Sequence, residues 1–112
     1  MQVVLYLVMI LKEIFLKRQS IRSFSSKPIP QEVLVELLEA AKIAPSAVNN
    51  QPWHFFVCSS PNIQEKIRHS YQRIWFQSAQ QYIVACADNR TSWKRPVDNK
   101  NHSHVDVAIA TT

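Results

Sequence analysis

Two guanidinium groups flank a hydroxyl group in the segment Arg18-Gln19-Ser20-Ile21-Arg22. Arginine binds phosphate through paired, charge-assisted hydrogen bonds, and a serine hydroxyl adds a further donor. In an extended backbone alternate residues point to the same side, so Arg18, Ser20 and Arg22 could converge on one anion. The other interpretation is a basic, solvated helix end, where positive charge suits the helix dipole. The charge layout alone favours the helix-end interpretation.

A second polar segment lies between Pro45 and Trp53, in the sequence PSAVNNQPW. Its side chains can donate and accept hydrogen bonds at the edge of a heterocycle, as flavin recognition requires; they are Ser46, Asn49, Asn50 and Gln51. The alternative is an ordinary connection whose amides satisfy their own backbone. The residue types of this loop are compatible with both interpretations.

The two segments are separated by the clearest helix pattern in the chain, which we expect over Gln31–Ala44. Its apolar residues recur at i, i+3, i+4 and i+7, and Pro45 ends it; they are Leu34, Leu37, Leu38 and Ala41. Before this helix, the pattern predicts a helix over Leu5–Lys17 and a loop over Gln19–Pro30.

After it, the pattern predicts two strands, over Trp53–Cys58 and Tyr82–Ala87, the second fully buried. Between the strands we expect a helix from Pro61 to about Phe76, with a buried face of Ile63, Ile67, Tyr71 and Ile74. A polar loop over Asp88–Ser103 and a helix-like segment over His104–Thr112 complete the chain.

The order of these pieces closely resembles the opening of nitroreductase-family proteins. The resemblance rests on R-x-S-x-R, then a spaced helix, then A-P-S-A-x-N-x-Q-P-W, within Leu11–Val57. A weaker match continues through YIVACAD, Trp93 and Asp106–Ala110. The resemblance implies an α+β fold, a nitroreductase-like α/β sandwich with helices around a small, mostly antiparallel sheet.

In that family the cofactor is FMN, bound at the interface of an intertwined homodimer. The resemblance implies that the first motif binds the phosphate and ribityl chain through Arg18, Gln19, Ser20 and Arg22. It implies that the second motif, usually supplied by the partner subunit, contacts the flavin through Pro45, Ser46, Ala47, Asn49 and Gln51. The implied reaction is hydride transfer from NAD(P)H to the flavin, then to a nitroaromatic, quinone or similar small-molecule acceptor. No catalytic side chain is assigned, because the flavin supplies the chemistry.

Two departures from the family pattern bear on this prediction. Val48 stands where family members often have glycine, and a β-branched residue is costly if the position needs positive φ. The family also continues beyond the position at which this chain ends, so we expect residues 11–112 to form the N-terminal part of an incomplete domain. The chain contains no glycine, which is unusual for an α/β enzyme. The competing hypothesis is a truncated, non-catalytic relative that acts as a flavin-binding or dimerisation module.

Residues 1–10 are expected to be an apolar extension or the start of a helix. The run Val3–Leu11 is nine residues long, and a membrane-spanning helix needs about 20. We expect this run to be buried in the core or in a subunit interface. Alternatively, translation starts at Met9, and residues 1–8 are an extension foreign to the fold. No membrane association is predicted.

The net charge of +5 is scattered over the chain, without a run of five like charges. A nucleic-acid-binding module, the third hypothesis, therefore rests on charge alone, and none is predicted. The two cysteines, Cys58 and Cys86, lie in apolar runs. They are expected to be buried, reduced thiols of a cytoplasmic protein, in preference to one cross-strand disulfide.

The pattern His102-x-His104-x-Asp106 has a spacing that could bind a metal ion on a strand. A solvated loop entering a helix explains it better, and Asp106 matches a family position that has no metal role. No metal site is predicted.

Overall fold

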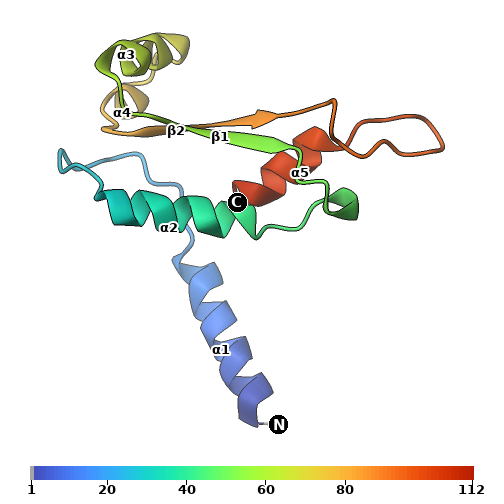
Figure 1. Cartoon of the computed structure of the whole chain (residues 1–112). Helices are drawn as coiled ribbons and strands as arrows, with labels where there is room; N and C mark the ends of the chain where they lie inside the picture. Colours follow the sequence, from blue (N-terminus) through green and yellow to red (C-terminus); the bar gives the residue numbers. More distant parts are fainter. Residues whose placement is uncertain (1) are drawn as a thin grey trace.

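The structure is a computed structural model that describes the backbone of residues 2–112 and the side chains from Val8 onward. Figure 1 shows a two-stranded ribbon flanked by helices. In chain order the elements are α1 (Gln2–Lys17), α2 (Gln31–Lys42), the 3-10 turn η1 (Ala47–Asn49), β1 (Trp53–Cys58), α3 (Pro61–Ser70), α4 (Ile74–Gln77), β2 (Tyr82–Ala87) and α5 (Ser103–Ala110).

β1 and β2 pair antiparallel, from Trp53 opposite Ala87 to Cys58 opposite Tyr82. Both strands have the predicted bounds, because proline, serine and polar residues flank two short runs of β-favouring residues. The prediction that β2 is fully buried is wrong: Tyr82 is buried, but Ile83 and Cys86 are exposed. The reason is that α2 and α5 lie on one side of the ribbon, and α3 lies near one end of the other side (Figure 1).

The predicted helix from Pro61 to Phe76 is interrupted, and its predicted buried face is wrong. α3 ends at Ser70, Tyr71 and Arg73 are extended, and a single helical turn follows as α4. Ile74 is consequently 89% exposed.

Side-chain contacts explain this interruption. The Tyr82 hydroxyl donates to the Phe76 carbonyl at 2.6 Å, and the Phe76 and Tyr82 rings lie 5.1 Å apart. The Arg68 guanidinium donates to the Gln77 and Ala79 carbonyls at 3.1 and 3.3 Å. These contacts fold α4 back against the end of α3 in place of a straight continuation.

α2 begins at the predicted residue and ends at Lys42, with Ile43 as its C-cap. Leu34 is buried at 4% exposed, while Leu37 on the same predicted stripe is half exposed. Leu37, Leu38 and Ala41 nevertheless line a cleft of about 280 Å³ against the inner face of the ribbon and the end of α5. The stripe therefore faces the sheet side, as its spacing predicts.

α1 projects away from the rest of the molecule (Figure 1). Its described side chains, from Val8 to Lys17, are all exposed, and Leu16 is 76% exposed. Core burial, one of the two expected positions of this helix, is therefore absent within the described residues. No helix among residues 2–112 is long and apolar enough to cross a membrane.

The molecule as a whole is extended. Its accessible surface is 9202 Å², whereas a folded monomer of this size exposes about 6,300 Å². Its radius of gyration is 17.3 Å, against about 13 Å for a compact domain of this length. The described residues leave much of their apolar surface uncovered.

The two cysteines have different environments, and neither forms a disulfide. Cys58 is buried as predicted, but Cys86 is exposed, which corrects the expectation of two buried thiols. The register places Cys86 opposite His54 and Cys58 opposite Tyr82, so the strands hold the two sulfur atoms apart.

Candidate functional site

The loop between α2 and β1 has an unusual backbone. Val48, Asn49 and Gln51 have φ angles of 48°, 57° and 48°. This left-handed region costs an L-residue about 1–2 kcal/mol, and asparagine tolerates it better than valine does. The suspicion that position 48 needs positive φ is confirmed, and a β-branched residue adopts it here.

Two side chains of the loop hold its shape. The Gln51 N–H donates to Ser46 Oγ at 2.9 Å, and Gln51 Nε2 donates to the Lys42 carbonyl at the end of α2, at 3.2 Å. Ser46 and Gln51 are therefore engaged with neighbouring backbone, as the alternative interpretation of this loop expects. Asn49 is exposed, and no hydrogen bond of its side chain is found among the described residues.

Two further contacts tie the loop to distant parts of the chain. Asn50 Nδ2 donates to the Thr91 carbonyl at 3.0 Å. The Ala47 N–H donates to Asp106 Oδ1 of α5, also at 3.0 Å, across 59 residues of sequence. Asp106 is buried. The sequence predicts no role in the site for Thr91 or Asp106, although Asp106 matches a family position.

The first motif lies in the connection between α1 and α2, and its site residues are exposed. The Arg18 N–H donates to the Ile14 carbonyl at 3.1 Å, which extends the last turn of α1. The Arg22 guanidinium lies 5.7 Å from the centroid of the Trp75 ring. Neither arginine forms an ion pair with the described residues, so both charges are open to an anion.

The two motifs precede and follow α2. Among residues 2–112, no hydrogen bond or ion pair links Arg18–Arg22 to Pro45–Gln51. The structure thus shapes each segment separately.

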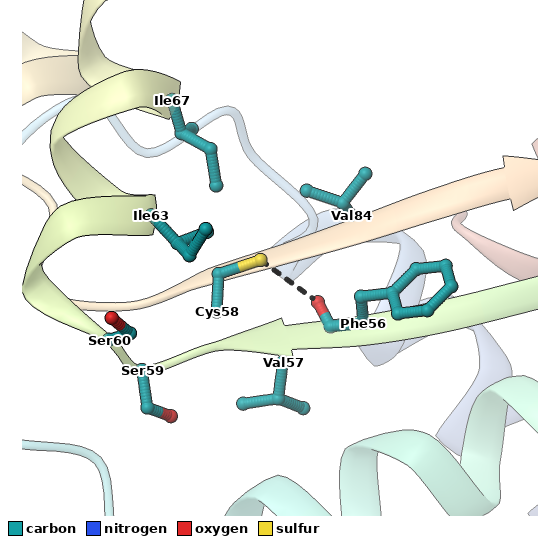
Figure 2. Close-up of a pocket in the computed structure, with 8 residues that line it drawn as sticks. All are labelled: Phe56, Val57, Cys58, Ser59, Ser60, Ile63, Ile67 and Val84. Carbon is teal, nitrogen blue, oxygen red and sulfur yellow. Dashed lines mark hydrogen bonds between the residues drawn. The ribbon is translucent and has the colours of Figure 1, made fainter.

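Two clefts lie along β1. One, of about 450 Å³, adjoins the loop and combines aromatic and apolar surface with the Lys42 ammonium and the His54 imidazole. Its lining residues are Leu38, Lys42, Gln51, Trp53, His54, Phe55 and Phe56. The other, of about 470 Å³, lies between α3 and the far end of β1 (Figure 2). It is mainly apolar, and the Cys58 thiol within it donates to the Phe56 carbonyl at 3.5 Å. The first cleft is better suited to a polar heterocycle.

An ion pair fixes the end of β2 next to the loop. Arg90 donates to both carboxylate oxygens of Asp88, at 3.0 and 2.8 Å, and its backbone N–H donates at 2.9 Å. His54 Nε2 lies 3.5 Å from the same carboxylate. The Arg90 side chain and then its N–H hold the pKa of Asp88 well below its usual range, although burial opposes the shift. The Asp88 N–H in turn donates to the Pro52 carbonyl at 2.9 Å.

No group of three or more acidic, histidine or cysteine side chains among the described residues could hold a metal ion. In the sequence pattern His102-x-His104-x-Asp106, Asp106 is engaged with Ala47.

Replacing Val48 with glycine should stabilise the folded chain, because glycine adopts positive φ without a steric cost. We expect a gain of about 1 kcal/mol in the free energy of unfolding, measured by denaturant titration. Val97→Gly is the matched control, since Val97 is 92% exposed and is not among the positive-φ residues; it should be neutral or slightly destabilising. Equal effects at both positions would contradict the strain assigned to Val48.

The interaction of Asp88 with Arg90 should make the free energy of unfolding fall in acid. Its folded-state pKa is depressed, so its stabilising contribution is present above the unfolded value of about 3.9 and is lost as the pH falls toward the folded value. Asp88→Asn should lower stability near neutral pH and flatten the decline below about pH 4. Parallel stability curves for the variant and the unmodified chain would refute this assignment.

Comparison with known proteins identifies the family. The model of the nitroreductase family matches residues 15–112. A putative NADH dehydrogenase/NAD(P)H nitroreductase of Archaeoglobus fulgidus is 39% identical over 82 residues, which are 72% of this chain and 47% of that protein. Iodotyrosine deiodinase 1 of Rattus norvegicus is 45% identical over 56 residues, covering 50% of this chain and 20% of that protein.

A solved structure supports the same family. It is a putative nitroreductase of Desulfovibrio desulfuricans in complex with FMN, superposes with a TM-score of 0.71 at 25% identity, and aligns with 88% of this chain and 56% of that one. The chain thus spans less than half of the two curated relatives and just over half of this structure. Its helices and antiparallel strand pair form part of a nitroreductase-like fold, and the chain belongs to the nitroreductase family.

Proposed function

We propose that this chain contributes the phosphate-binding and ring-binding segments of an FMN-dependent oxidoreductase. The FMN would accept hydride from NAD(P)H and reduce a nitroaromatic, quinone or similar small molecule. The observation that carries the proposal is the pair of exposed arginines, Arg18 and Arg22, which lack acidic partners among the described residues. They occur in a family that includes a relative with bound FMN.

The donor set of the first segment fits the phosphate of FMN. Two guanidinium groups, the Ser20 hydroxyl and the Gln19 amide supply the charge and the hydrogen bonds that a phosphate and a ribityl chain accept. The Arg22 position is restrained by the Trp75 ring, which lowers the entropy lost when the side chain binds an anion.

The second segment fits the flavin ring in a different way. Asn49 offers a free amide on an exposed turn, and Pro45, Ala47 and Val48 offer apolar surface beside it. Ser46 and Gln51 were assigned to the cofactor by resemblance, and their internal hydrogen bonds favour a role in shaping the turn. Their backbone groups could still face the ring.

A homodimer would bring the two segments together. No hydrogen bond or ion pair among residues 2–112 links the segments, and the exposed surface exceeds that of a compact monomer by about 2,900 Å². A second copy could supply the missing loop at each site while covering α1 and the open face of the ribbon. The start of α1 would then lie at this interface, and residues 11–112 would be part of the catalytic domain.

A cytosolic location is part of the proposal. It is supported by two cysteines that remain free thiols in the described chain.

Arg18→Ala should weaken FMN binding, because it removes a charge-assisted hydrogen bond to the phosphate. The expected loss is about 1.5–3 kcal/mol, or roughly tenfold to 150-fold in the dissociation constant. The change can be measured by flavin fluorescence titration of the full-length protein. Arg73→Ala is the control, since Arg73 is also exposed and lies outside both motifs. Unchanged affinity in Arg18→Ala would count against the phosphate assignment.

The acceptor has a second candidate, because the chain is 45% identical to a deiodinase over 56 residues. Reductive deiodination of an iodinated tyrosine would break the carbon–iodine bond and release iodide, while two electrons from the reduced flavin and a proton from solvent would form the carbon–hydrogen bond. The experiment compares reoxidation of the reduced flavoprotein by a nitroaromatic, a quinone and 3-iodotyrosine under anaerobic conditions. We expect the nitroaromatic and the quinone to react faster. Iodide release with little reaction of the other two would favour the deiodinase candidate.

A non-catalytic role as a flavin-binding or dimerisation module remains the alternative to both. It requires a stable dimer that does not oxidise NADH or NADPH. Sustained NAD(P)H oxidation by the full-length protein would exclude it.

A further inference from the structure

Asp106 is a buried carboxylate whose charge is only partly satisfied. The residue is 3% exposed, in the first turn of α5. Oδ1 accepts the Ala47 N–H at 3.0 Å, whereas Oδ2 is buried and has no hydrogen-bond partner among the described residues. Burying an incompletely paired carboxylate is costly, and an apolar residue of similar shape often serves packing equally well or better. Its place in the first turn of α5 suits the helix dipole, and the bond from the Ala47 N–H is the one hydrogen bond that the carboxylate forms with the described residues.

Ala47 occupies the position in the loop that needs such a partner. It is the first residue of η1, and the first N–H groups of a helical turn have no backbone acceptor within the turn. The next two residues, Val48 and Asn49, are in the left-handed region. Since valine disfavours that region, the turn requires an external restraint to keep this shape, and the Asp106 carboxylate provides one at its first residue.

The restraint is rigid because α5 is itself anchored. The Ser103 hydroxyl donates to Asn89 Oδ1, and the Ser103 N–H donates to Asn101 Oδ1 at 2.8 Å. Ser103 is buried. The second long-range hydrogen bond of the loop, from Asn50 Nδ2 to the Thr91 carbonyl, reaches the segment just before α5. Residues 89–106 thus form the support on which the turn is held at two points.

We propose that Asp106 is a positioning residue for the flavin, which acts by holding the Ala47–Asn49 turn in the conformation that meets the cofactor. The residue does not contact FMN itself. The inference rests on the proposed function, because the cofactor is what the turn is positioned for. It adds a residue from α5 to a site otherwise built from the two motifs.

Two substitutions separate this role from packing. Asp106→Leu keeps a branched side chain of similar outline and removes both oxygens. It relieves the burial of a partly paired charge but leaves the Ala47 N–H without its acceptor, so we expect the fold to be kept with at most a modest loss of stability. Asp106→Asn keeps one carbonyl oxygen that can accept the Ala47 N–H and removes the charge. If positioning depends on the hydrogen bond, the asparagine variant should be rescued and the leucine variant should not.

The experiment uses the full-length protein and three measurements: thermal unfolding, hydrogen exchange of the Ala47 amide without FMN, and the FMN dissociation constant. For Asp106→Leu we expect a stable fold, faster exchange at Ala47 and about tenfold weaker FMN binding. For Asp106→Asn we expect slow exchange and affinity within about threefold of the unmodified protein. If Asp106→Leu does not fold, Asp106→Asn with fast exchange at Ala47 would still overturn the proposal.

Unchanged FMN affinity in Asp106→Leu, or equal losses in both variants, would also overturn it. Failure of the unmodified protein to bind FMN would instead defeat the proposed function, and the cofactor role of Asp106 with it. The exchange measurement would then decide separately whether Asp106 restrains the turn.

Discussion

The hydrogen bond from the Ala47 N–H to the Asp106 carboxylate connects the loop after α2 with α5, 59 residues further along the chain, at the candidate site. It joins a turn that follows α2 to a helix that begins 56 residues after that turn begins. Between them the strand pair supplies a fixed spacing, since β1 starts beside the turn and β2 ends near the support of α5. The turn can hold a valine at positive φ because packing and hydrogen bonds elsewhere outweigh its local preference.

The same arrangement supports the proposal that a single chain forms only part of a flavin site. Its arginine segment and its loop are shaped independently, and much apolar surface of α1 and of the ribbon is uncovered. A two-stranded sheet is marginal alone and gains stability from what packs on its faces. On the proposed function, further chain, a second copy or both would complete the fold and the flavin pocket together, so folding and cofactor binding would be linked.

Sequence reasoning located the strands and α2 well because their signals are local. Apolar and aromatic runs bounded by proline and serine fix β1, and i, i+3, i+4 spacing fixes α2. The predictions were wrong where contacts between distant residues determine the structure. Contacts of the Tyr82 hydroxyl and of Arg68 end the helix before Tyr71. Cys86 is exposed because no described element covers it. The motif residues of the site were visible in the sequence as types and spacing. Their division into groups free for a ligand and groups that shape the turn was not, and neither was the partnership of Ala47 with Asp106.

If one flavin is held by the arginine segment of one subunit and the loop of another, mixing two differently mutated subunits should rebuild an intact site. One variant carries Arg18→Ala with Arg22→Ala, and the other carries Asn49→Ala with Gln51→Ala; each alone should bind FMN poorly. In a mixed dimer one site then has both lesions and the other has neither. The account predicts that mixing restores strong binding to one FMN per mixed dimer. No restoration in verified mixed dimers would show that each site is built within one chain, and would contradict it.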